Sequence, residues 1–226
     1  MSEPPTPPQR CNAATLFASR GPGFVMPPES GFRLAPGLNG KEPSAAFKTD
    51  AALGVEPTSE ELSAVVLSMC DAQEVSEQAG GSEAHQAPSV CFAGLGEPLL
   101  RLDTLLDTVR RVKARRPGVS FRVSTNGLFD SSVAVALADG GIERATVALA
   151  SADGAQYDAL MRPVRLPGEQ RPRGLRDVVA FITRLSMSGV FVEVGVVAHP
   201  DVDVAAARRL AHTVGANGVR VRTYFP

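Results

Sequence analysis

The feature that most constrains the fold is an alternation of short apolar runs with amphipathic segments, which begins at residue 58 and continues to residue 224. The apolar runs have the length and composition of buried strands, and the segments between them carry apolar residues at helical spacing. The predicted strands are 89–93, 119–125, 144–150, 190–197 and 218–224, and the predicted helices are 58–76, 102–115, 131–139, 153–161, 175–188 and 203–214. Because parallel strands need such crossovers, we predict an α/β fold with a parallel sheet, open or curled into part of a barrel.

The first quarter of the chain has a different character. The whole chain has 18 prolines, and 10 of them lie before residue 58, where no periodic apolar pattern is found. We therefore divide the chain into a mostly irregular Pro/Gly-rich segment, 1–57, and an α/β domain, 58–226. Thr58 and Glu61 have the spacing of a capping box, which predicts that the first helix begins there.

Composition excludes several classes of function. With 23 Lys+Arg against 24 Asp+Glu, the net charge of −1 provides no global field for phosphate backbones, so we expect no nucleic-acid partner. No apolar run is long enough to cross a bilayer, and we expect a cytoplasmic protein without a membrane partner. The 3 cysteines and 3 histidines are too scattered for a disulfide framework or a zinc site.

In parallel α/β folds, ligands bind at the carboxyl ends of the strands. After the first predicted strand come Gly94, Gly96, Glu97 and Pro98, where the glycines allow close backbone approach and the carboxylate could accept hydrogen bonds from a ligand ammonium group. The segment Ser124–Gly127 follows the next strand. Spacing alone favours the plainer interpretation of two ordinary turns into the following helices.

Strand alternation also places charged residues on shared faces. Arg122 lies on one face of its strand with Ser124 and Asn126, and Arg220 lies on one face with Arg222. Glu193 lies on one face of the predicted strand 190–197 with Gly195 and Val197. These residues could form an internal ion-pair network that fixes strand register, or a pocket for a carboxylate or phosphate group.

Taken together and in this order, the two turns resemble those of a known family. GLGEPLL at 94–100 and RVSTNG at 122–127 are similar to segments of the radical S-adenosylmethionine (SAM) superfamily, and the closest resemblance is to the TatD-associated radical SAM proteins. The likeness continues through 147–163, 192–203 and 219–224. It implies a partial (β/α) barrel in which the turn at 94–98 holds the amino group of SAM and polar residues at later strand ends, here Ser124 and Asn126, hold the ribose.

The same resemblance shows that the cluster-binding loop departs from the family's cysteine motif. The family carries a C-x3-C-x2-C motif whose thiolates bind three irons of a [4Fe–4S] cluster, and the matching segment here is 11–20. Cys11 stands at the first ligand position, but Thr15 and Ala18 stand at the other two. A threonine hydroxyl stays protonated at neutral pH and alanine has no donor atom, so we expect no cluster on this motif.

Further departures agree with this loss. The proline-rich residues 1–10 cannot form the strand that normally precedes the motif, so we expect the first barrel strand to be missing. Its absence would leave an edge at 89–93 that another segment or chain could cover. Ala148 and Ala150 replace side chains that would bind SAM in the family. Cys70 and Cys91 are expected to be small buried thiols rather than substitute ligands.

Three functions remain open at this point. We favour a radical SAM-fold protein that has lost its cluster and acts as a pseudoenzyme or as a binding or scaffold subunit, with a protein partner such as a related active subunit. The alternatives are an active radical SAM enzyme that cleaves SAM to a 5′-deoxyadenosyl radical, and a cluster-free SAM- or anion-binding α/β enzyme. The sequence does not name a substrate.

Overall fold

The computed structural model describes residues 11–13, 20–24, 56–80, 88–93 and 96–226. Within these residues, five parallel strands form one sheet in the order β1-β2-β3-β4-β5. The strands are β1 (Ser89–Phe92), β2 (Ser120–Thr125), β3 (Arg144–Ala148), β4 (Phe191–Val197) and β5 (Gly218–Arg222). The helices are α2 (Ser59–Gly80), the 3-10 helix η3 (Pro98–Arg101), α3 (Leu102–Arg115), α4 (Ser131–Asp139), α5 (Gly154–Met161), α6 (Leu175–Met187) and α7 (Val204–Thr213).

The predicted alternation is confirmed, with small differences at the ends of elements. The capping box forms at the start of α2, where Thr58 and Glu61 exchange hydrogen bonds between backbone N–H groups and side-chain oxygens. This helix runs to Gly80, four residues beyond the prediction. Strand β3 stops at Ala148 rather than residue 150, because the chain turns there into the loop that leads to α5.

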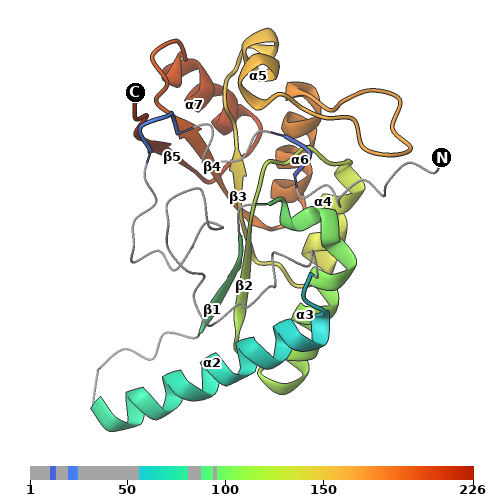
Figure 1. Cartoon of the computed structure of the whole chain (residues 1–226), viewed down its shortest axis with the longest axis vertical. Helices are drawn as coiled ribbons and strands as arrows, with labels where there is room; N and C mark the ends of the chain where they lie inside the picture. Colours follow the sequence, from blue (N-terminus) through green and yellow to red (C-terminus); the bar gives the residue numbers. More distant parts are fainter. Residues whose placement is uncertain (1–10, 14–19, 25–55, 81–87, 94–95) are drawn as a thin grey trace, which may run out of the picture.

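The core lies between the sheet and the helices on one of its faces. Alternate residues of the central strands, such as Val192, Val194 and Val196 of β4, are fully buried on that face. Figure 1 shows α3, α4 and α6 along one side of the sheet. In-register pairing places Arg122, Arg144 and Phe191 together on the opposite face, where all three are exposed. The sheet therefore has one apolar, helix-covered face and one polar face.

Strand β1 differs from the prediction of a buried strand. It lies at the edge of the sheet, pairs only with β2 among the described residues, and alternates between exposed and half-buried side chains. An edge strand has one neighbouring strand fewer to cover it. This explains why the apolar side chains of β1 are not fully buried. Among the described strands β1 is an edge strand, and the expectation that its outer edge is open stays a prediction. The expectation of a missing first strand falls on residues 1–10, which lie outside that part.

No helix in the described ranges is long and apolar enough to span a bilayer.

Candidate functional site

The candidate site lies where the strands end, and its centre is the carboxylate of Glu97. This residue follows β1, caps the start of η3, and is only 6% exposed. One carboxylate oxygen accepts hydrogen bonds from the Thr125 hydroxyl at 2.7 Å and the Leu99 N–H at 3.1 Å. The other accepts the Asn126 N–H at 2.8 Å. Glu97 therefore ties the end of β1 to the end of β2.

Burial dominates the ionisation of Glu97. Desolvation raises its pKa from 4.5 to about 7, against the lowering effect of the hydrogen bonds from Asn126, Thr125 and Leu99. A carboxylate offers about four lone-pair positions, and three of them are used here. Among the described residues, the oxygen that faces Asn126 accepts no second hydrogen bond.

Asn126 links this carboxylate to the start of the described chain. Its side-chain NH2 donates to the Oδ1 atom of Asn12 at 2.6 Å, and its own Oδ1 accepts the Leu128 N–H at 2.9 Å. Asn12 is buried and donates in turn to the Leu128 carbonyl oxygen. In the structure the Asn126 side chain therefore shapes the turn, and its predicted contact with the ribose of SAM stays a prediction. Ser124, by contrast, is half-buried and its hydroxyl makes no hydrogen bond within the described residues.

Cys11 lies beside Asn126, with 4.0 Å between the Asn126 Nδ2 and the thiol sulfur. Burial is the largest influence on this thiol and raises its pKa, which favours the protonated form. The other two motif positions, Thr15 and Ala18, lie outside the described residues, as does Gly94.

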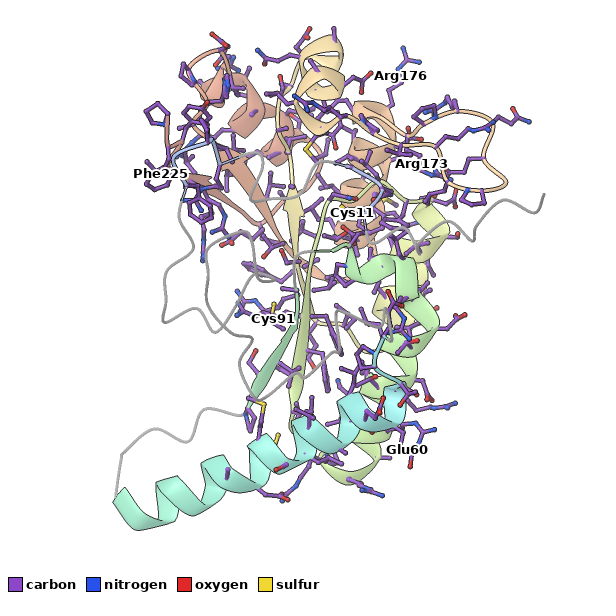
Figure 2. All side chains as sticks on the ribbon, viewed as in Figure 1. Cys11, Glu60, Cys91, Arg173, Arg176 and Phe225 are labelled. Carbon is purple, nitrogen blue, oxygen red and sulfur yellow. The ribbon has the colours of Figure 1, made fainter. Side chains whose placement is uncertain are left out.

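The donor set does not fit an iron–sulfur cluster. No group of three or more His, Cys, Asp or Glu side chains within the described ranges could hold a metal ion. Cys70 is buried on α2 and Cys91 lies on β1, and Figure 2 shows Cys91 well away from Cys11. A [4Fe–4S] cluster needs several thiolates at one place, and this site supplies a single thiol, Cys11. The prediction that Cys70 is buried is confirmed. The same prediction for Cys91 is wrong, because its strand lies at the sheet edge.

The ends of β3 and β4 enclose a small apolar hollow of about 20 Å³. Ala148 and Ala150 line it together with Gly195, Val197 and His199. The two alanines thus face the same hollow. Space of this size suits a single water, and nucleoside-sized ligands need several hundred Å³.

Residues 20–24 contact the segment that follows β5, the strand at the other edge of the sheet from β1. The guanidinium of Arg20 lies over the rings of Phe24 at 4.5 Å and Phe225 at 5.3 Å, and its Nε donates to the Thr223 carbonyl. The Phe225 N–H donates to the Arg20 carbonyl at 2.8 Å, and the Gly23 N–H to the Phe225 carbonyl at 3.2 Å. Residues 11–13 therefore bond to the turn after β2, and residues 20–24 bond to the segment after β5.

Sequence reasoning missed several residues at these ends. Thr125 and Asn12 were not singled out, since a threonine inside a strand and an asparagine in a proline-rich segment carry no local signal of their role. The Ser151 hydroxyl donates to Gln156, whose side-chain NH2 donates to the Asp201 carbonyl at 2.6 Å. These bonds join the loops after β3 and β4 and have no motif in the sequence.

The predicted anion pocket is dispersed along one face. Arg122, Glu193, Arg220 and Arg222 share the polar face, as strand alternation predicted, but they follow a diagonal. Arg220 lies opposite Gly195 and forms an ion pair with Glu193 at 3.2 Å, which matches the network interpretation for that pair. Arg122 lies two strands from Glu193 and three from Arg220, and it pairs directly with Arg144.

Comparisons with known proteins agree with the fold. No family model matches the chain. A curated relative, the probable dual-specificity RNA methyltransferase RlmN 1 of Opitutus terrae, is 33% identical over 147 residues, or 62% of this chain. That match covers 39% of the relative, so the chain spans about two fifths of its length.

A solved structure described as native anSMEcpe with bound AdoMet superposes with a TM-score of 0.61 at 14% identity. It covers 97% of this chain and 50% of that protein. This likeness extends over almost the whole chain and confirms the predicted α/β fold class with its parallel strands.

Proposed function

We propose that this chain is a radical SAM-fold protein that has lost its [4Fe–4S] cluster and acts in the cytoplasm as a pseudoenzyme or as a binding or scaffold subunit. The observation that carries the proposal is the composition of the motif: of its three ligand positions only Cys11 offers a thiolate, and Thr15 and Ala18 offer none. Descent from the superfamily is supported by the similarity to RlmN 1 and by the fold shared with anSMEcpe. Within the superfamily, the motifs at 94–100 and 122–127 favour the TatD-associated group.

The test is the iron and sulfide content of the purified chain after anaerobic reconstitution, measured with its visible spectrum. Thiolate-bound clusters absorb broadly in the visible range, so we expect a colourless, folded protein with substoichiometric iron. A stoichiometric cluster would refute the proposal and favour the active radical SAM enzyme. The variant Cys11→Ala serves as the matched control, because loss of colour on that substitution would identify the residual thiol as a true ligand.

SAM binding without a cluster is a second candidate, and the Glu97 carboxylate favours it. The described residues donate to three of its lone-pair positions, and the Ser124 hydroxyl, on the other face of β2 from Thr125, makes no hydrogen bond with the described residues. SAM would be held by Glu97 through its amino group and by Ser124 through a hydroxyl. Binding of SAM measured by calorimetry should be weakened about tenfold in Ser124→Val, which leaves the Glu97 hydrogen bonds intact. Unchanged binding in that variant would place the ligand elsewhere.

A protein partner remains part of the proposal. The outer edge of β1 is unpaired by any described strand, and such edges are commonly covered by another segment or chain. Size measurement in solution, with the chain alone and with candidate radical SAM subunits, tests whether a second protein binds.

A further inference from the structure

We propose that Arg122 and Arg144 form a binding site for a phosphate monoester on the polar face of the sheet. The two residues are partners in the register of β2 and β3, so their side chains leave the same face from strands about 4.8 Å apart. Both are exposed. The site is independent of the proposed function, because it uses none of the strand-end residues assigned to SAM.

Like charges placed directly opposite each other across two strands repel, so this arrangement is unfavourable unless an anion joins them. No acidic side chain in the described part of the chain forms an ion pair with Arg122 or Arg144. The acid on this face, Glu193, is bound to Arg220. From strand spacing and rise, Arg220 is about 16 Å from Arg144, too far to share one small anion with it.

The two guanidinium groups turn to neighbours that are not anions. Arg144 lies over the ring of Phe191, on β4, at 4.3 Å. Arg122 interacts with the thiol of Cys91, on β1. The two guanidinium groups therefore turn toward opposite neighbours, Cys91 on β1 and Phe191 on β4. A doubly charged oxyanion between them would match their combined charge and use the planar donor edges of both groups.

The charge favours a phosphate monoester over a carboxylate. A phosphate monoester carries about −1.5 to −2 near neutral pH and offers three acceptor oxygens, whereas a carboxylate carries a single charge. The chain as a whole has a net charge of −1, so this positive site is a local feature that global composition conceals. The predicted ligand is a small metabolite with a terminal phosphate.

Inorganic phosphate is the first probe, with acetate as the single-charge comparison. We expect saturable phosphate binding by calorimetry, stronger at about pH 8 than at about pH 6 because the dianion predominates at the higher pH. Arg122→Gln and Arg144→Gln should each weaken it about tenfold or more. Arg220→Gln, which removes the same charge elsewhere on this face, should change the affinity by less than about twofold. Equal weakening by all three variants, or no phosphate binding by the folded wild type, would overturn the site.

Alkylation of Cys91 gives a second readout that does not depend on the variants folding equally well. Cys91 is exposed as a residue, although partial desolvation of its thiol raises the pKa. Arg122 acts in the other direction and lowers the pKa of this thiol. Phosphate bound at Arg122 should therefore slow modification of Cys91 by a neutral alkylating reagent, followed by peptide mass spectrometry. Acetate at equal ionic strength should not. Identical rates with the two salts would contradict a phosphate at this position.

Discussion

The buried carboxylate of Glu97 should make the stability of this protein fall as pH rises. The group titrates at about 7 in the folded chain and at an ordinary 4.5 when exposed, so between these values the folded state binds a proton that the unfolded state does not. Stability therefore decreases with pH across that window, by about 3 kcal/mol if Glu97 acts alone. The contribution of the protonated form is complete below pH 4.5 and is lost above pH 7.

The assay is urea unfolding followed by circular dichroism for the wild type and Glu97→Gln, from about pH 4.5 to pH 8. Glutamine places an NH2 donor toward either the Asn126 N–H or the donors Thr125 and Leu99, so a pH-independent cost of about 1–3 kcal/mol is expected. At the acid end the wild type should be more stable than the variant by this amount. The difference should fall by about 3 kcal/mol toward neutral pH, so that it vanishes or changes sign.

Because the remaining titrating groups are common to both proteins, the difference between the two profiles isolates Glu97. Glu143→Gln removes an acidic side chain that is 49% exposed and bound to Lys113, and should change stability by no more than about 0.5–1 kcal/mol. Parallel profiles for the wild type and Glu97→Gln would refute the reasoning, since they would mean that the carboxylate ionises in the folded chain as it does in water.

Three further outcomes test the packing around the site. Tyr157→Phe should leave the free energy of unfolding unchanged or raise it by about 1 kcal/mol, because the buried hydroxyl has no hydrogen-bond partner among the described residues; a loss of stability in urea unfolding would contradict this. Asn12→Ala should cost about 1–3 kcal/mol and speed proteolysis near residue 11, since it removes the bonds to Leu128 and Asn126. Cys11→Ala should change thermal unfolding by only a few degrees, and a collapse of the melting temperature would point to a bound group.

Several parts of this structure were available from local patterns. The five strands and their helices follow from apolar periodicity, and the capping box of Thr58 and Glu61 forms as its spacing predicts. Alternation correctly put Arg122, Glu193 and Arg220 on the same side of the sheet, because side-chain direction along a strand has a period of two.

Tertiary structure decided what these residues contact. Glu97 meets Thr125 and Asn126, 28 and 29 residues later, and that meeting sets its burial and its raised pKa. Cys91 is exposed because β1 lies at an edge, and Arg122 faces Arg144 because of strand register. Periodicity within a segment is fixed by the segment's own residues, so the sequence determined the elements and their faces. Register, edge position and burial depend on which strands become neighbours, so only the assembled sheet could determine them.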